Sequence, residues 1–270
     1  MKNILITLGC SFTQGDGCWD LDSLKHPYFK NKTWDELNFN EKSTLFDLNK
    51  ERFLRYSWPS QLQEMLGYDE LYNLGFGGAS ISHSVKMFME DIYYRDKDFN
   101  GCNVLVIQLL SFPDRISFYT NGSLQTMPSG HPVHDSLVEF MDIQLDGDSE
   151  GIDGNRDDTT LEAYFYMKVM KGLCENKGWN FLFTGARGDE SLHMKTYKDN
   201  LRIQSSYMPF VSFLNYTNEY KSFEGHPNEK WYKIMAEKMY DWIVENKKEI
   251  PMGTATEFIK ERVLPKNYRK

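Results

Sequence analysis

Short apolar runs alternate with amphipathic segments along this chain of 270 residues. Apolar runs that are bounded by turn residues predict buried strands, and four of them cover residues 2–8, 70–74, 104–110 and 180–184. A weaker strand candidate covers residues 208–214. The run at 104–110 is the most apolar of the five, which favours a central position in a parallel sheet.

Between these runs, apolar residues recur at helical spacing. One helix is predicted to open at Ser57-Trp58-Pro59, with Ser or Trp at the cap and proline in the first turn. Further helices are expected up to Ile92, over 159–174 and over about 228–245. Six side chains of the last helix form a stripe at i, i+3 and i+4 spacing that predicts burial, namely Trp231, Ile234, Met235, Met239, Trp242 and Ile243. Because strands and helices alternate, we expect an α/β fold with a mostly parallel sheet and right-handed crossovers.

Two stretches show no clear periodicity. Residues 19–56 are polar and rich in aromatic side chains, and residues 116–157 are irregular as well, so both are interpreted as insertions. The chain contains no tandem repeat and no Pro-, Gly- or Ser-rich linker that would divide it. We therefore expect one domain over residues 1–250, followed by a C-terminal extension over 251–270.

The charge balance and the cysteines exclude several classes of partner. Lys and Arg number 31 against 39 Asp and Glu, a formal charge of −8, whereas binding to nucleic acid requires at least a local surplus of basic side chains. The four cysteines form no CxxC pair, so we expect reduced thiols and neither a disulfide framework nor a zinc site. They are Cys10, Cys18, Cys102 and Cys174.

The distribution of apolar residues also indicates whether the chain crosses a membrane and where in the cell it is expected. No apolar run approaches the roughly 18 residues that a membrane-spanning helix needs. The apolar stretch near the N-terminus is shorter than the roughly 7–15 residues of a signal-peptide core. The expected location is therefore the cytoplasm, without a membrane partner.

Three of the predicted strands end in unusual sequences. These are Gly9-Cys10-Ser11-Phe12-Thr13, Gly75-Phe76-Gly77-Gly78-Ala79-Ser80 and Ser111-Phe112-Pro113-Asp114-Arg115. In open parallel sheets, ligands bind beyond the carboxyl ends of the strands. The three segments are therefore expected to meet at one functional site.

The first of these segments offers a nucleophile. A free serine hydroxyl is a poor nucleophile at neutral pH, so Ser11 would need a neighbouring base. His226, just before the last predicted helix, is the candidate base, and Glu224 is placed to orient its imidazole. Each residue also has a purely structural interpretation, since Ser11 fits a helix N-cap and His226 fits a helix-capping histidine beside an exposed Glu224.

The glycine-rich segment offers an anion-binding loop. Glycines after a strand allow backbone N–H groups to approach a ligand closely, which suits a developing oxyanion. A phosphate-binding loop or a plain turn are the alternatives. The glycine spacing over residues 73–80 matches neither GxGxxG nor the Walker pattern, so a nucleotide site is disfavoured.

Together these segments resemble the SGNH (GDSL-like) hydrolase family, from residue 1 to about 245 with the two insertions outside. In this resemblance Ser11 takes the nucleophile position, Gly78 the oxyanion-hole glycine and His226 the base in the block Glu224–Pro227. Asn73, which is typical of the second block, is taken as a substrate-binding residue. The resemblance implies a flavodoxin-like three-layer α/β/α sandwich with a mostly parallel five-stranded sheet. It also implies ester hydrolysis through an acyl-serine, with no metal or organic cofactor.

The chain departs from the family at two places. Ser111 stands where the family has an asparagine that donates to the oxyanion, and loss of one such donor costs about 10²–10³ in turnover. Arg115 is a candidate for binding a substrate carboxylate or phosphate, or else forms a surface ion pair with Asp114. At the catalytic acid, many members carry Asp where this chain has Phe223, so Glu224 is the carboxylate expected in that role.

The resulting prediction is a serine esterase that hydrolyses a small O-acyl ester, such as O-acetyl on a carbohydrate. Ser11 would attack, with His226 and Glu224 as its partners, and the amides of Ser11 and Gly78 with the hydroxyl of Ser111 would bind the oxyanion. The alternatives are a non-catalytic glycan-binding or assembly module of the same fold, and an acyltransferase. The expected partner is a small-molecule or glycan ester, and the oligomeric state is left open.

Two further features each allow two interpretations. An acidic stretch partly follows the calcium-loop pattern or is a solvated loop, and comprises Asp146, Asp148, Glu150, Gly151 and Asp157. A set of aromatic side chains in the insertions would stack on sugar rings or simply pack the insertions, and comprises Trp19, Tyr28, Trp34, Phe112, Phe118 and Tyr119.

Overall fold

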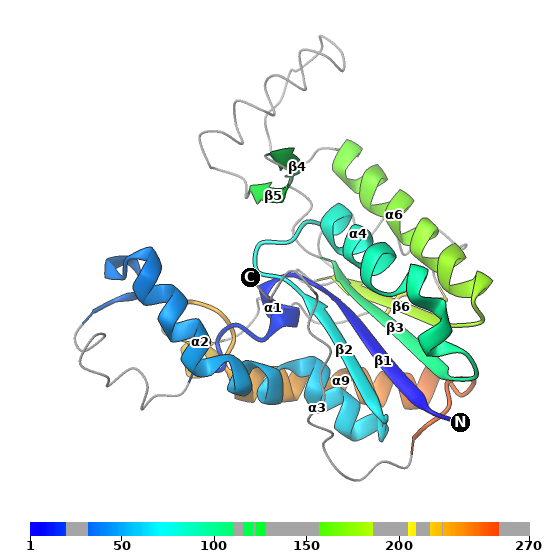
Figure 1. The fold of residues 1–270 in the computed structure, drawn as a ribbon. Coiled ribbons are helices and arrows are strands. Elements are labelled where there is room, and N and C mark those ends of the chain that lie inside the picture. The colour runs from blue at the N-terminus through cyan, green and yellow to red at the C-terminus, as the bar shows by residue number, and fades with distance from the viewer. Residues whose placement is uncertain are drawn as a thin grey trace.

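The computed structural model describes residues 1–19, 32–110, 116–120, 123–127, 157–185, 205–208, 217–222 and 224–253. This part of the chain is built on a parallel β-sheet with helices on both faces (Figure 1). Among the described residues, no helix combines the length and the apolar character needed to cross a membrane.

The central sheet has four parallel strands in the order β2-β1-β3-β6. The strands are β1 (Asn3–Gly9), β2 (Glu70–Gly75), β3 (Asn103–Leu110) and β6 (Asn180–Gly185). The pairing Gly9↔Gly75 brings the ends of β1 and β2 to the same edge of the sheet. The four strand predictions are confirmed, and the most apolar run, β3, is central as expected because both of its faces are covered.

The expectation of five strands is wrong for the described residues. Beyond β6, Tyr207 forms a single parallel bridge with Phe183, which places the chain at the edge where a fifth strand would pair. Of the candidate strand 208–214, only Met208 is described, and the remainder lies outside the described residues.

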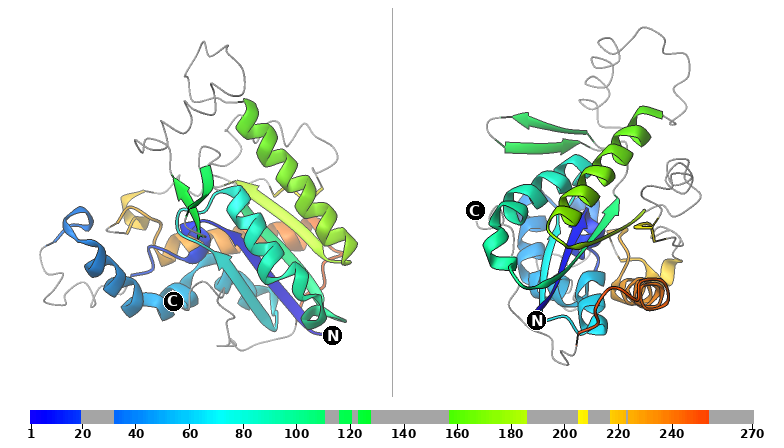
Figure 2. Two further views of the ribbon diagram at one scale, coloured as in Figure 1. Left: turned by 45° about the horizontal axis from the view of Figure 1, so that its top comes forward. Right: turned by 90° about the vertical axis from the view of Figure 1, so that its right-hand side faces the viewer.

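Helices cover the two faces of the sheet as separate layers (Figure 2). On one face lie α4 (Ile81–Asp91) and α6 (Asp157–Asn176), and on the other lie α3 (Trp58–Leu66) and α9 (Glu229–Asn246). Alternate residues of a strand point to opposite faces, so Ile4 belongs to the core beneath α4 and α6 while Leu5 belongs to the core beneath α3 and α9. The three-layer α/β/α arrangement is therefore confirmed.

The helix boundaries follow the signals in the sequence. Ser57 occupies the N-cap position of α3 without a capping hydrogen bond from its side chain, Pro59 lies in the first turn, and Gly67 ends the helix in the left-handed conformation (φ 65°). In α9 the predicted stripe faces the core: four of its side chains are buried and the other two are partly buried against them. Asn228 caps α9 by accepting hydrogen bonds from the amides of Lys230 and Trp231.

Both insertions contain regular structure that the sequence analysis did not predict. In the stretch 19–56, η2 (Trp34–Glu36) precedes α2 (Phe39–Tyr56), which extends away from the sheet (Figure 1). In the stretch 116–157, β4 (Ile116–Thr120) and β5 (Ser123–Met127) form an antiparallel pair. Both stretches were expected to be irregular, and this expectation is wrong for these segments. The other short helices are α1 (Ser11–Gln14), η3 (Tyr93–Phe99) and η4 (Asn218–Tyr220).

The first residues after position 250 lie against the end of α3. The Gly253 amide donates to the Leu66 carbonyl over 2.8 Å, and the Tyr68 hydroxyl donates to the Pro251 carbonyl over 2.9 Å. The division into a domain over 1–250 and an extension over 251–270 stays a prediction, because residues 254–270 lie outside the described residues.

Candidate active site

Ser11 lies at the carboxyl edge of the sheet, directly after the central strand β1. The chain turns at Gly9 with φ 151°, where a Cβ would lie 2.3 Å from Thr13 Oγ1, so the turn requires glycine. Ser11 then opens the short helix α1, which ends at Gly15 in the left-handed conformation (φ 102°). The serine is thus held at the edge of the sheet by a strand on one side and a tight helical turn on the other.

His226 reaches the same edge from the other end of the chain. Its Nε2 lies 2.8 Å from Ser11 Oγ. The turn that carries it is closed by a hydrogen bond from the Ser222 amide to the His226 carbonyl over 2.8 Å. The edge of the Phe12 ring lies against the imidazole, with centroids 5.5 Å apart and an interplanar angle of 78°. The predicted pairing of Ser11 with the candidate base His226 is therefore present in the structure.

Glu224 lies on the far side of the imidazole from Ser11. Its Oε1 is 3.6 Å from Nδ1 of His226, and its side chain is only 2% exposed against 30% for His226. Burial raises the pKa of the Glu224 carboxyl well above its ordinary value, and the neighbouring charge of Asp16 raises it further, while the side chain of Trp19 opposes the shift. The three residues are arranged in the order of a Ser–His–acid triad, with a carboxyl that burial biases towards its neutral form.

The glycine-rich loop between β2 and α4 lies beside Ser11. The Gly77 amide donates to Gln14 Oε1 over 2.6 Å, and the Phe76 amide donates to the Gly9 carbonyl over 3.1 Å, so the loop is fixed to the serine turn. Gly78 has φ 80°, and a Cβ placed on it would meet no described atom within 4 Å. On this side Gly78 thus has no neighbour among the described residues, which is compatible with the predicted contact with a ligand.

Asn73, expected to bind substrate, is buried beneath the loop. Its Nδ2 donates to the Thr13 carbonyl over 2.8 Å, and its Oδ1 accepts from the Gly75 amide over 3.0 Å and from Thr7 Oγ1 over 3.3 Å. Both polar atoms of the amide are therefore used within the protein. Asn73 therefore joins β2 to the serine turn, and its expected contact with substrate stays a prediction.

Several predicted features lie outside the described residues. These are Ser111, Arg115, the acidic stretch apart from the backbone of Asp157, the aromatic residues Tyr28 and Phe112, and the side chains of Phe118 and Tyr119. Within the described part of the chain, no group of three or more His, Cys, Asp or Glu side chains is placed to hold a metal ion.

The aromatic residues of the first insertion pack on one another. Trp19 lies edge-on against Phe53, with centroids 4.7 Å apart, and also against Phe46 at 5.1 Å. Trp34 lies 5.7 Å from Trp19, and the ammonium of Lys42 lies over its ring. Because Trp19 is 5% exposed, these contacts favour the packing interpretation over a sugar-stacking wall for the described members of the set.

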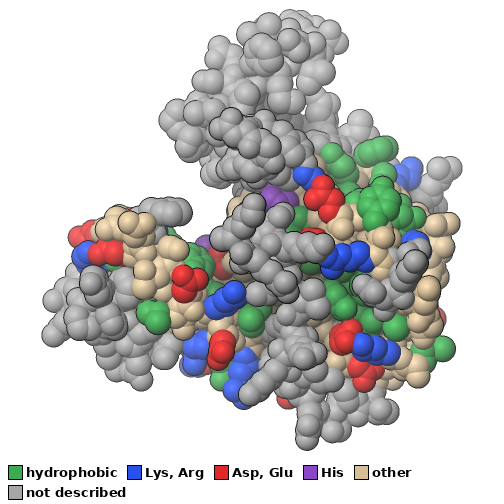
Figure 3. Space-filling model, in the orientation of Figure 1, with side chains coloured by type: hydrophobic (Ala, Val, Ile, Leu, Met, Phe, Trp, Pro, Cys, Tyr) green, Lys and Arg blue, Asp and Glu red, His purple; other side chains and the backbone are tan. Residues whose placement is uncertain are grey.

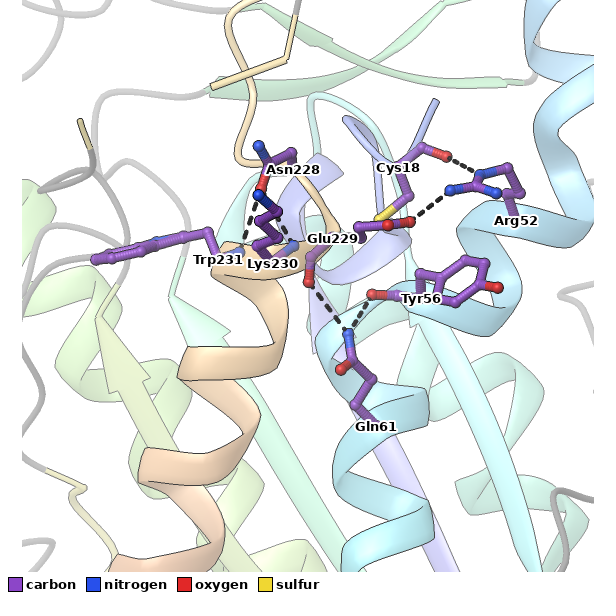
Figure 4. Close-up of polar contacts among 8 residues, drawn as sticks. All are labelled: Cys18, Arg52, Tyr56, Gln61, Asn228, Glu229, Lys230 and Trp231. Atoms are coloured by element: carbon purple, nitrogen blue, oxygen red, sulfur yellow. Dashed lines mark hydrogen bonds and ion pairs between the residues drawn. The ribbon is translucent and has the colours of Figure 1, made fainter. Parts of the chain in front are cut away.

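A polar network links α2 to the start of α9, where the histidine turn enters the helix (Figure 4). Arg52 donates to the carboxylate of Glu229 over 2.5 Å and to the carbonyl of Cys18 over 3.3 Å. Gln61 donates to the carbonyl of Tyr56 over 2.6 Å and to that of Glu229 over 3.5 Å. Sequence reasoning missed these residues because it did not predict α2.

The surface around this region carries charges of both signs. Figure 3 shows histidine side chains at a recess between the α2 side of the molecule and the body that contains the sheet. On the face drawn, acidic and basic side chains of the described residues are interspersed.

Comparisons with known proteins agree with the fold. No family model matches the chain, and no curated protein matches it either. Among solved structures, it is similar to a carbohydrate esterase whose active site displays divergent catalytic and non-catalytic binding functions, with a TM-score of 0.52 and 13% identity over 91% of this chain. The present chain spans 66% of the length of that esterase. At this identity the likeness shows a shared α/β fold.

Two other solved structures are more distant. One is an alpha/beta hydrolase enzyme from the metagenome of Lake Arreo, Spain, with a TM-score of 0.38 and 13% identity over 88% of this chain and 94% of that chain. The other is a gut microbial diltiazem-metabolizing enzyme, with a TM-score of 0.31 and 13% identity over 89% of this chain and 46% of that chain. Neither likeness is close enough to support an argument.

Proposed function

We propose that the protein is a serine esterase of the SGNH type, which hydrolyses a small O-acyl ester. The observation that carries this proposal is the distance of 2.8 Å between Nε2 of His226 and Oγ of Ser11, two residues that are 215 positions apart in the sequence. A helix-capping serine and a surface histidine have no reason to meet in this way. A nucleophile and its general base must meet at about this distance.

In the proposed reaction, Ser11 Oγ attacks the acyl carbonyl carbon while Nε2 of His226 accepts the hydroxyl proton. The tetrahedral intermediate collapses when the imidazolium returns this proton to the leaving alkoxide, and the acyl group stays on Ser11. Water then attacks the acyl carbon and gives one proton to His226, which passes it to the Ser11 oxygen as the carboxylic acid leaves. The base contributes about 10²–10⁴ to the rate.

Glu224 stabilises the imidazolium in this scheme. Formation of a positive charge on His226, 3.6 Å from Glu224 Oε1, favours the ionised carboxylate and counteracts the burial that raises its pKa. The carboxylate and the imidazolium therefore support each other at the moment of proton transfer.

Backbone amides are the proposed donors to the oxyanion. They are the Ser11 amide at the start of α1 and the Gly78 amide in the glycine-rich loop, and hydrogen bonds of the neighbouring Gly77 and Phe76 amides fix this loop to the serine turn. The Ser111 hydroxyl is the third proposed donor, in the place of the family's asparagine. Donors that are already in place bind the developing charge without reorganisation.

The substrate that we infer is an ester with a small acyl group, such as an O-acetyl group on a carbohydrate. The resemblance to the SGNH family supports this choice, and the structural neighbour of the same fold is a carbohydrate esterase. Arg115 remains the proposed contact for an anionic substituent of the substrate. Release of acetate from acetylated sugars, measured against cleavage of longer acyl esters, tests the choice.

A fluorophosphonate probe tests the mechanism directly. The Ser11 oxygen would displace fluoride from phosphorus, and mass spectrometry would locate the adduct. We expect the wild type to be labelled at Ser11 and neither Ser11→Ala nor His226→Ala to be labelled. Ser205→Ala, which removes an exposed serine, should label like the wild type. A folded wild type without label would instead favour a non-catalytic binding module.

A further inference from the structure

Gln14 is a residue of the serine turn that the proposed mechanism does not use. It is the last residue of α1, the short helix that begins with Ser11. Its amide donates to the Cys10 carbonyl over 3.0 Å, so its backbone is held in the same turn as the nucleophile. A group that the side chain of Gln14 binds is therefore kept at a fixed separation from Ser11.

The side chain of Gln14 reaches the glycine-rich loop. Its Oε1 accepts a hydrogen bond of 2.6 Å from the Gly77 amide, and a Cβ on Gly77 would lie 3.2 Å from the same oxygen. The loop also packs on the backbone of Gln14, since a Cβ on Gly75 would lie 2.3 Å from its nitrogen. Because a backbone N–H only donates, the group that holds Gly77 must be an acceptor. Glutamate would keep this acceptor, whereas methionine would fill similar space without it.

The residue that Gln14 holds belongs to a tight turn whose third residue is Gly78. The turn is closed by a hydrogen bond of 2.9 Å from the Ala79 amide to the Phe76 carbonyl. Gly78 has φ 80°, whereas the φ of Gly77 is not positive, and these are the features of a type II turn. In a type I turn the central peptide is rotated by roughly half a turn, so the N–H of the third residue points to the other side. Glycine at both central positions makes either form sterically accessible.

The two ends of this turn are anchored independently of Gln14. Before the glycine pair, the Phe76 amide donates to the Gly9 carbonyl over 3.1 Å. After it, Ser80 caps α4 by accepting a hydrogen bond of 3.1 Å from the His83 amide. Between these anchors lie two consecutive glycines, which lose more conformational freedom on ordering than other residues do. The hydrogen bond from Gly77 to Gln14 restrains this freedom, and a change of Gln14 leaves both anchors in place.

We propose that Gln14 is a positioning residue, which holds the turn at Gly77 and Gly78 in the form that presents the Gly78 amide to the oxyanion formed on Ser11. This inference rests on the proposed function, in which the Gly78 amide is an oxyanion donor. Because Gln14 and Ser11 share one helical turn, the nucleophile and the donor keep their relative position while the charge develops. A donor that is already in place stabilises this charge without reorganisation.

Amide hydrogen exchange tests the hold on the turn without any need for catalysis. Exchange of the Gly77 amide is followed by NMR in the wild type, in Gln14→Met and in Gln14→Glu. In Gln14→Met we expect the Gly77 amide to exchange faster by about fivefold or more, because its acceptor is lost. Gln14→Glu should keep at least the wild-type protection, because its carboxylate accepts the same hydrogen bond. Unchanged exchange of Gly77 in Gln14→Met would overturn the proposal.

The catalytic meaning is tested by the kinetics of fluorophosphonate labelling. As Ser11 displaces fluoride, the phosphonyl oxygen takes the place of the oxyanion. A misaligned donor should therefore lower the maximal rate of labelling but leave the probe concentration for half of that rate unchanged. For Gln14→Met we expect the maximal rate to fall by about 10–100-fold, at most to the range for loss of a whole donor.

The matched control is Gln63→Met. It removes a side-chain hydrogen bond of 3.1 Å to the Tyr68 carbonyl, just before β2 and at the end of the sheet away from Ser11, and it should label at the wild-type rate. A wild-type rate in Gln14→Met, or an equal loss in Gln63→Met, would contradict the positioning role. A wild type that is never labelled would overturn the proposed function instead, and amide exchange would still decide whether Gln14 holds the turn.

Discussion

Arg52 and Glu229 lie 177 residues apart in the sequence, and their side chains form an ion pair of 2.5 Å between the helix α2 and the first turn of α9. The same guanidinium donates to the carbonyl of Cys18, shortly after the serine turn (Figure 4). One side chain of the first insertion is therefore bonded both to the chain that follows Ser11 and to the helix that follows His226. Through these bonds α2 helps to hold the segment after Ser11 and the helix after His226 at a fixed separation.

Arg52→Met should slow fluorophosphonate labelling of Ser11 by about tenfold, because small displacements of reacting groups are costly. The loss of stability should stay below about 1 kcal/mol, since the pair is partly exposed. Labelling rates and urea unfolding measure the two effects separately. Lys233→Met removes an exposed ion pair with Glu237 on the same helix and should change neither quantity. Wild-type labelling by Arg52→Met would show that the pair does not position the site.

Gly17→Ala should both destabilise the protein and abolish labelling, because its new Cβ would lie 2.0 Å from the Pro227 carbonyl oxygen, next to His226. Gly101→Ala is the matched control. Both glycines have positive φ, 102° and 74°, but a Cβ on Gly101 would meet no described atom within 4 Å. The control should lose only about 1–2 kcal/mol in urea unfolding, the cost of the backbone conformation, and label normally. Equal losses of stability in Gly17→Ala and Gly101→Ala would contradict the close contact at Gly17.

Much of the fold could be predicted because its signals are local. Strands β1, β3 and β6 are buried along nearly their whole length and β2 along most of it, so each is a short, mainly apolar run, and α3 and α9 carry caps and stripes. The helix α2 was missed because it extends away from the sheet and, among its described side chains, fully buries only Leu45, Asn49 and Phe53, a sparse stripe with a polar member. The pair β4–β5 carries no comparable signal in its five-residue strands.

The candidate site was predicted only as far as local sequence signals reveal it. Ser11 follows from its position after a predicted strand, and His226 follows from the block Glu224–Pro227 before the last predicted helix. The structure brings the two side chains together. Asp16 was overlooked although it stands five residues after Ser11, because the burial of a carboxyl depends on distant segments such as α9. The hydrogen bonds by which Asn73 holds the serine turn were not predicted for the same reason, since the partners of a buried amide lie in segments distant in the sequence.

Asn73→Ala should destabilise the protein by about 2–3 kcal/mol, because it leaves the Thr13 carbonyl and the Gly75 amide without their buried partner. Urea unfolding measures this loss. Asn176→Ala, which removes an exposed amide that donates to the Tyr93 hydroxyl over 3.2 Å, should stay within about 0.5 kcal/mol of the wild type. A stable Asn73→Ala variant with a raised KM would instead support the prediction that Asn73 binds substrate.

The stability of the protein should fall as the pH rises from about 5 to about 8. Burial raises the folded-state pKa of Glu224 above its ordinary value of 4.5, and that of Asp16 above 3.8. Between the ordinary and the raised values, the folded protein binds more protons than the unfolded chain, so each such group contributes stability at low pH that is lost as pH rises through its folded pKa. The slope per group approaches about 1.4 kcal/mol per pH unit. Urea unfolding at several pH values across this range measures the slope.

Glu224→Gln should flatten the slope of stability against pH, whereas Glu219→Gln, at an exposed position, should not. An unchanged slope in Glu224→Gln would mean that Glu224 ionises normally in the folded protein.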